Sequence, residues 1–202
     1  MLTSRDPTAK KTCISRRNMN TTNLGKEKID IIQSIIQQPV EEIHAPVHEM
    51  LTTAASFDNL SAIKLIMKDG TTVFFSANTI DLVEQVEVSL LDVTTSLEFS
   101  YYPGGPSVPW QPIISLSTRF NGLTVEHFRV LSASWQVATG SDDQVLYGSS
   151  PRFLQYSSSS DADTYNIEDG VILFCSGRKF LTICTVNSLV GSLNVSYSEG
   201  PL

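Results

Sequence analysis

The amino-acid sequence predicts an all-β body, either a β-sandwich or a closed barrel, preceded by a basic arm and one short helix. Three observations predict this class. From Ala62 onward, short runs rich in β-branched and aromatic residues are separated by turn-forming residues. The helices that would connect parallel strands are missing from that stretch. Seven of the 14 Lys and Arg residues lie in the first 28 residues, which show no apolar periodicity.

Residues 1–28 are predicted to form a flexible basic arm. They are rich in Thr, Ser, Asn and cations, a composition that buries too little apolar surface to offset chain entropy. Seven cations against two acids give this arm a charge of +5, whereas residues 29–202 carry seven cations and 19 acids, or −12. The seven cations are Arg5, Lys10, Lys11, Arg16, Arg17, Lys26 and Lys28.

Residues 29–60 are predicted to hold a short helix and a linker. Ile29, Ile32 and Ile36 recur at helical spacing, and Pro39 ends the pattern, so we expect a helix over about residues 26–37. Two placements remain open for this helix. It packs beneath a shell or against a neighbouring subunit, or it caps the core of its own domain.

Residues 61–202 are predicted to form the sandwich domain, and its first half reads as strands. The stretch "AIKLIMKDGTTVFFSA" predicts a hairpin that turns at Asp69-Gly70, where glycine tolerates positive φ. "VEQVEVSLLDV" and "SLEFSYY" follow as strands, and "SANTIDLVEQ" is the one stretch with a helical alternative. "PGGPSVPWQP" is predicted to be a loop because four prolines and two glycines interrupt regular structure.

The second half continues the series. "IISLSTRF" is predicted to be a strand, Asn121-Gly122 a turn, and "TVEHFRVLSASWQVA" a long strand with a one-residue bulge that reconciles two sets of apolar positions. "SSSSDADTYNIEDG" is predicted to be a polar loop. "VILFCSGRKFLTICTV" predicts a hairpin that turns at Ser176-Gly177, and "GSLNVSYSEG" predicts a closing strand with one polar face.

Motifs for enzymatic chemistry are missing from the sequence, so we expect no catalytic residues. It contains no G-x-S-x-G, G-x-x-x-x-G-K-[ST], H-E-x-x-H or G-x-G-x-x-G. His44 and His48 are four residues apart and would share one face of a helix, but Pro46 between them opposes a helix, so we expect linker histidines and no metal site. His127 is expected at a surface or edge position of its strand.

The three cysteines predict a reduced, intracellular setting. Cys13, Cys175 and Cys184 form an odd set without the spacing of a metal site. The hairpin turn places Cys175 opposite residue 180 rather than 184, so we expect buried free thiols in place of a disulfide. No apolar run is long enough to cross a bilayer, so no membrane partner is expected.

Acidic residues gather in two of the predicted loops. Asp142 and Asp143 lie in "TGSDDQ", and Asp161 and Asp163 lie in "SDADTYNIED", which also holds Glu168 and Asp169. Clustered carboxylates bind Ca²⁺ within one chain or between two, but the spacing does not match an EF-hand. Solvated loop acids are therefore expected, and no cofactor is predicted.

The basic arm is suited to a polyanion. Lys and Arg neutralise phosphates without reading sequence, and the counterions that they release drive binding. Without aromatic residues between the cations, base stacking is not expected. A solubilising tail or a short localisation signal is the alternative interpretation.

The pattern of the chain resembles the coat proteins of small RNA viruses, notably those of plants. The resemblance rests on the basic "AKKTCISRR", on the strand series from "AIKLIMKDG" to "VILFCSGRKFLTIC", and on the closing "GSLNVSYSEG". It implies a jelly-roll shell domain, an arm that contacts single-stranded RNA, and self-assembly into a virion in the host cytoplasm. Proteins of this kind bind interfacial calcium in loops like the one that holds Asp142 and Asp143, but no matching motif fixes these positions, so the resemblance does not assign them as a site. The arm is less basic, and the body more acidic, than in many such proteins.

The predicted function is therefore a capsid subunit whose partners are copies of itself and the RNA genome. A viral movement-type protein that binds nucleic acid without catalysis is a first alternative. A carbohydrate- or receptor-binding sandwich is a second, with Trp110 and Tyr101-Tyr102 as its aromatic platform.

Overall fold

The structure is a computed structural model that describes residues 19–46, 56–83, 86–100, 104–138, 146–149, 162–186 and 191–200. The strands of the first half are β1 (Met19–Thr22), β2 (Val40–Pro46), β3 (Ser56–Leu60), β4 (Ala62–Met67), β5 (Thr72–Val83), β6 (Val86–Thr94) and β7 (Trp110–Pro112). Those of the second half are β8 (Val125–Ala138), β9 (Leu146–Ser149), β10 (Ala162–Cys175), β11 (Lys179–Val186) and β12 (Ser192–Glu199). The two helices are α1 (Lys26–Ser34) and α2 (Ile114–Phe120).

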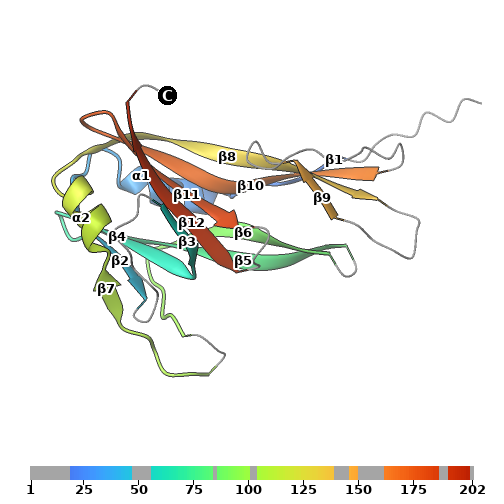
Figure 1. The fold of residues 1–202 in the computed structure, drawn as a ribbon, viewed down its shortest axis with the longest axis horizontal. Coiled ribbons are helices and arrows are strands. Elements are labelled where there is room, and N and C mark those ends of the chain that lie inside the picture. The colour runs from blue at the N-terminus through green and yellow to red at the C-terminus, as the bar shows by residue number, and fades with distance from the viewer. Residues whose placement is uncertain are drawn as a thin grey trace, which may run out of the picture.

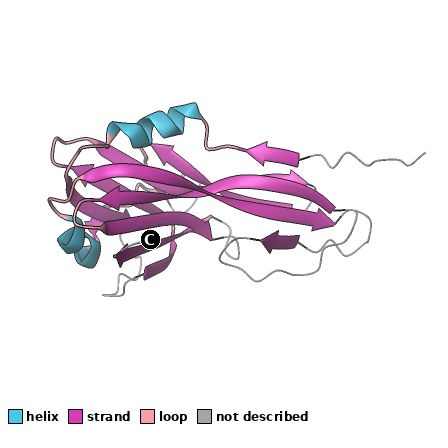
Figure 2. Ribbon diagram, turned by 90° about the horizontal axis from the view of Figure 1, so that it is seen from above, coloured by secondary structure: helices cyan, strands magenta, loops and turns pink. Residues whose placement is uncertain are grey.

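The strands form two sheets that face each other (Figure 1). One sheet has the order β3-β12-β11-β10-β8-β9, with β1 added beside β10, and the other has the order β6-β5-β4-β2-β7. Every strand pair is antiparallel except β1 with β10. Figure 2 shows α1 along one side of the layers and α2 at one end. The predicted all-β sandwich is therefore confirmed.

The jelly-roll connection is not confirmed. A jelly roll is built from two Greek keys, in which a fourth strand returns to lie beside the first. Here β4, β5 and β6 are neighbours in chain order in one sheet, and β10, β11 and β12 are neighbours in the other. Short turns after residues 67 and 175 keep consecutive strands in one sheet, so each sheet contains a meander.

The core lies between the sheets and follows the alternation expected from the sequence. Ile63, Leu65 and Met67 of β4 are fully buried, as are Leu193 and Val195 of β12. Because successive strand side chains point to opposite faces, these positions share the inner face of their strands. The two predicted hairpins and the closing strand are confirmed by the register of β4 with β5, β10 with β11, and β11 with β12.

Helix α1 caps the core of its own chain, which decides between the two placements left open by the sequence. Ile32 and Ile35 are fully buried and belong to the main apolar cluster. The helix ends at Ser34, three residues earlier than predicted, and the chain then turns through Gln37, whose φ is +66°. The Gln37 amide donates to the Val125 carbonyl at 2.7 Å and so ties this turn to the start of β8.

The stretch "IISLSTRF" is helix α2, so the strand predicted there is wrong. Ile113, Leu116 and Phe120 are fully buried at helical spacing, whereas Ile114 is 74% exposed. The segment closes one end of the sandwich, where a helical stripe covers the core better than an alternating face.

Three further predictions are corrected by strand pairing. Residues 76–83 of "SANTIDLVEQ", the stretch with a helical alternative, continue β5, which pairs with β6 from residue 74 to residue 83. Residues 162–170 of the predicted loop "SSSSDADTYNIEDG" form the first half of β10, paired with β8, whereas the part before Ala162 lies outside the described residues. The predicted linker over 29–60 holds β2 and β3. In β2, β3 and β10, hydrogen bonds to a strand distant in the sequence outweigh the local polar composition, whereas β5 pairs with the strand that follows it.

The bulge predicted in the long strand 125–138 occurs at the expected position but in the partner strand. Glu168 pairs with Ser132 and Gly170 with Leu131, so the additional residue is Asp169 of β10. A bulge in either strand shifts the faces of both relative to each other, and the apolar pattern of one strand does not say which of them carries the additional residue.

Candidate functional site

The N-terminal segment joins the sandwich at a defined position. Strand β1 pairs in parallel with residues 164–167 of β10, the half of β10 beyond its pairing with β11. After β1, the Leu24 amide donates to Glu168 Oε2 at 2.6 Å, and Leu24 is buried. Residues 19–28 therefore belong to the folded body, and the arm predicted over 1–28 is corrected at its C-terminal part. The local sequence gave no signal for β1 because its four residues, "MNTT", have no apolar pattern.

Two of the seven predicted RNA-binding residues lie in the described structure, on α1. Lys26 is exposed, whereas Lys28 Nζ lies 2.6 Å from Asp92 Oδ1 of β6, and both side chains are partly exposed. The ion pair joins α1 to the five-stranded sheet and neutralises Lys28 within the body. The other five residues, Arg5, Lys10, Lys11, Arg16 and Arg17, lie outside the described residues.

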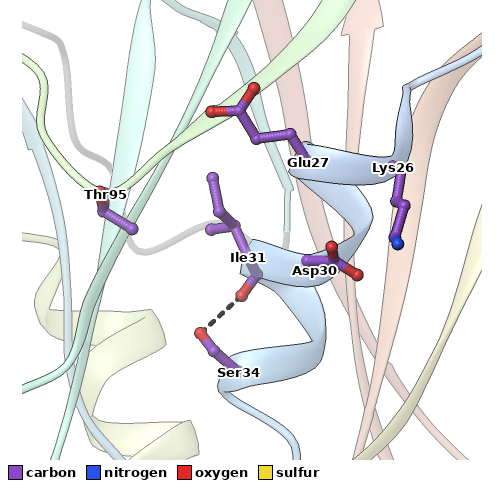
Figure 3. A pocket seen from close by; sticks show the side chains of 6 residues that line it. All are labelled: Lys26, Glu27, Asp30, Ile31, Ser34 and Thr95. Atoms are coloured by element: carbon purple, nitrogen blue, oxygen red, sulfur yellow. Dashed lines mark hydrogen bonds between the residues drawn. The ribbon is translucent and has the colours of Figure 1, made fainter.

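A shallow hollow of about 620 Å³ lies between the outer face of α1 and the segment after β6 (Figure 3). It is lined by Lys26, Glu27, Asp30, Ile31, Ser34 and Thr95. Ser34 Oγ donates to the Ile31 carbonyl at 2.7 Å, so it is engaged within the helix. The polar groups of the hollow come almost entirely from one exposed helical face, which is typical of a solvated surface.

Aromatic residues gather on the outer face of the five-stranded sheet. The Trp110 ring meets Phe74 edge to face at 5.3 Å between centroids and Phe99 at 6.3 Å. Lys64 Nζ lies 5.5 Å from the Trp110 centroid and 6.0 Å from that of Phe74, within reach of a cation–π interaction. The indole is thus already engaged by the sheet and the segment before β7. Tyr101 and Tyr102, its predicted companions, lie outside the described residues.

His44 of β2 lies directly opposite Lys64 of the neighbouring strand β4. Its Nε2 is 2.6 Å from Glu42 Oε2, and its Nδ1 is buried without a hydrogen-bond partner in the described structure. His48 lies outside the described residues. Among the described residues, no three His, Cys, Asp or Glu side chains are grouped as metal ligands would be.

The acidic residues considered as calcium ligands lie mostly outside the described structure. Asp142, Asp143 and Asp161 are not described, and Asp163 lies on β10 opposite Val137 of β8. The structure therefore does not bring a described set of these carboxylates together.

Of the remaining histidine and cysteine predictions, those for His127, Cys175 and Cys184 fall on described residues, whereas Cys13 lies outside them. His127 is exposed on β8 and stacks on Phe174 at 4.1 Å, in the predicted surface position. Cys175 pairs with Lys179, and Cys184 with Gly170, so the two cysteines are not opposite each other. Both are buried free thiols, as predicted. Burial raises the pKa of the Cys175 thiol to about 12, and the Glu126 carboxylate adds to the shift.

The structure also gathers four cations that the sequence analysis did not single out. Lys68, Arg119, Arg178 and Lys179 lie in or beside turns at the α2 end of the sandwich (Figure 1). We name this set the basic end. The signal available in the sequence was that each predicted turn at this end has a cation within about two residues, but nothing local places the turns together.

Comparison with known proteins identifies no relative. No protein-family model matches the chain, and the searches of curated proteins and of solved structures returned no match. Within the described part of the chain, neither helix has the length and apolar character needed to span a membrane. Function must therefore be inferred from charges and contacts within the chain itself.

Proposed function

We propose that this protein is a non-enzymatic structural subunit that assembles with copies of itself into a virus shell and contacts single-stranded RNA through its N-terminal arm. The observation that carries the proposal is the division of charge. The first 28 residues carry +5, and residues 29–202 carry −12. A polyanion is attracted to the first part and repelled by the second.

The anchoring of residues 19–28 supports this division. Strand β1 and Leu24 hold the chain against β10. The segment that carries the cations before residue 19 therefore joins the body at one fixed position. Lys28 is paired with Asp92 and contributes little to RNA binding. The proposal therefore assigns the RNA contacts to Arg5, Lys10, Lys11, Arg16 and Arg17, with the exposed Lys26 as an addition.

The proposed shell domain is a two-sheet sandwich built from meanders, and the proposal does not depend on a jelly roll. The virion, and the host cytoplasm during assembly, are the proposed locations. Of the alternatives, the carbohydrate platform has less support because the Trp110 ring is engaged by Phe74, Phe99 and Lys64. A movement-type protein would bind RNA with its body as well, which the charge of −12 opposes.

The test compares the full chain with a variant of the same length in which Arg5, Lys10, Lys11, Arg16 and Arg17 are all replaced by Gln. Binding to single-stranded RNA is measured between about 50 and about 500 mM salt, roughly one third to three times the physiological ionic strength. The slope of log K against log salt should become shallower by up to about 3.5, since each phosphate contact contributes roughly 0.7.

Particle formation is followed in the same samples by negative-stain microscopy and size exclusion. We expect uniform particles of the full chain with RNA. An unchanged salt slope would overturn the assignment to the arm, and a chain that stays monomeric with RNA at every salt concentration would overturn the shell function.

A further inference from the structure

The outer face of the seven-stranded sheet contains two neighbouring rows of side chains without an acid. One row crosses β8, β10, β11 and β12 from His127 to Ser198 and includes Phe174 and Phe180. The four positions of the next row are Arg129, Ile172, Thr182 and Ser196. Leu173 of β10, between the two rows, is buried in the core, so both rows face away from the core. We name these eight residues the acid-free face.

Phe174 holds two planar side chains in place on this face. Its ring is 8% exposed, and the His127 ring stacks on it at 4.1 Å between centroids, with 14° between the planes. Arg129 Cζ lies 5.4 Å from the Phe174 centroid, and Phe180 meets the same ring edge to face at 5.3 Å. His127 and Arg129 are themselves exposed. A ligand that stacks on these two groups meets planes that are already ordered, which lowers the entropic cost of binding.

The acids that flank the rows engage groups outside them. Glu126, next to the first row, acts on the buried Cys175 thiol, whose pKa is raised by burial and by this carboxylate. Glu199, at the end of β12, lies 3.7 Å from Arg119 and from Lys179. The charge of −12 on residues 29–202 is therefore unevenly distributed, and the acid-free face holds a cation and no anion.

The N-terminal segment joins the sheet that carries this face. Strand β1 pairs with residues 164–167 of β10, and β10 also contributes Phe174 to the acid-free face. RNA that is held by the cations of the arm is thus tethered to the same sheet, which raises its effective concentration at the face. Single strands stack their bases on aromatic rings and on guanidinium planes without requiring a particular base.

We propose that the acid-free face binds single-stranded RNA, with bases stacked on the planes of His127 and Arg129. This inference rests on the proposed contact with RNA and adds a second contact, on the body itself. The arm supplies charge and the face supplies stacking, so the two contacts differ in salt dependence. A chain without the arm cations keeps part of its affinity, with a salt slope of about 0.7 from the one cation of the face.

The experiment measures binding of a single-stranded oligoadenylate of about 16 nucleotides. It uses the full chain and the arm variant, in which the five arm cations before residue 19 are Gln. Each carries H127A/R129A or the control R178N, which also removes one exposed cation but at the hairpin tip outside the two rows. Asn tolerates the left-handed backbone of Arg178, whose φ is +59°. H127F keeps an aromatic plane, and circular dichroism with urea unfolding confirms that every variant folds.

In the arm variant, H127A/R129A should weaken oligoadenylate binding at least about fivefold, as the loss of one stacked base does. R178N and H127F should leave this binding nearly unchanged, because both keep the stacked planes. Inorganic polyphosphate carries charge but no bases, so it should displace oligoadenylate poorly from the arm variant.

Unchanged binding after H127A/R129A would overturn the inference and leave the role of the arm intact. Equal losses in H127A/R129A and R178N, or ready displacement by polyphosphate, would replace stacking with general charge. An arm variant that binds no oligoadenylate would remove the second contact. Loss of self-association by H127A/R129A with RNA binding unchanged would assign the face to contact between copies. A full chain that binds no RNA at any salt concentration would remove the proposed function as well.

Discussion

Glu168 anchors the chain segment that follows β1 to the body. Its carboxylate accepts the Leu24 amide at 2.6 Å, just past the four residues of β10 that pair with β1. A charge-assisted hydrogen bond of this kind is stronger than one between neutral groups. One acid of the strongly acidic body therefore orients the basic N-terminal segment.

Replacing Glu168 with Ala should lower the free energy of unfolding by about 1–3 kcal/mol, because the partly buried Leu24 amide loses its acceptor. Urea unfolding measures the change, and hydrogen exchange should become faster at residues 19–24. The control is Glu98→Ala, at an exposed position. Equal unfolding midpoints for the two variants would contradict the role of Glu168.

Cys175 makes stability depend on alkaline pH. Burial raises the pKa of its thiol to about 12 in the folded state, against about 8.5 for an unperturbed thiol. Because the folded pKa is the higher one, this contribution is complete below about pH 8.5 and is lost as pH rises toward 12. Between pH 8 and 11, the free energy of unfolding measured in urea should fall more steeply with pH for the unmodified chain than for Cys175→Ala. Parallel pH profiles would refute this.

At the scale of elements, β10 connects most parts of the fold. It pairs with β8, β11 and β1, and its bulge at Asp169 changes the register between its two halves. Gly170 follows the bulge at a point of close contact with β11. Strand β10 is therefore the element in which small changes should have the largest effect.

The variant Gly170→Ala should be destabilised by about 1–3 kcal/mol, as overpacked sites are. A Cβ at this position would lie 2.7 Å from the Cys184 Cβ and 2.9 Å from the Ile183 carbonyl oxygen. Thermal unfolding measures the cost, and Ser132→Ala, an exposed substitution across from the bulge, provides the comparison. If the Gly170→Ala and Ser132→Ala proteins had the same melting temperature, β11 would have moved away from the added methyl group without cost.

The Ser117 hydroxyl group links helix α2 to β2. The Ile43 amide donates to Ser117 Oγ at 2.9 Å, and Ser117 Oγ donates to the Ile43 carbonyl at 3.0 Å. Ser117→Ala should cost about 1–3 kcal/mol because the Ile43 amide loses its acceptor. Chemical denaturation should separate it from Thr118→Ala, an exposed change on the same helix. Similar values for both would mean that water replaces the hydroxyl.

The whole molecule is a sandwich with two unlike ends. At one end lie α2 and the turns whose cations form the basic end. The β5–β6 hairpin extends toward the opposite end of the sandwich (Figure 1). The N-terminal segment is anchored along β10 rather than at the basic end. Charge is therefore arranged along the body as well as between the arm and the body.

Two truncations test where the folded body begins. Deleting residues 1–18 removes none of the described contacts, so the free energy of unfolding should stay within about 0.5 kcal/mol of that of the full chain. Deleting residues 1–25 also removes β1 and the buried Leu24, and should cost at least about 2 kcal/mol. Denaturation by urea distinguishes them. Equal stability of both truncated chains would place the start of the body after residue 25.

The sequence by itself determined the class of the fold, the hairpins at Asp69-Gly70 and Ser176-Gly177, and the division of charge, because alternation, turn chemistry and charge are local properties. Only the tertiary structure decided that 114–120 is helical, that the bulge lies at Asp169, and that β1 joins β10. The same holds for the gathering of cations from separate turns on one surface. Each of these depends on which distant segment covers or pairs with which, and a short stretch of chain does not encode its remote neighbours.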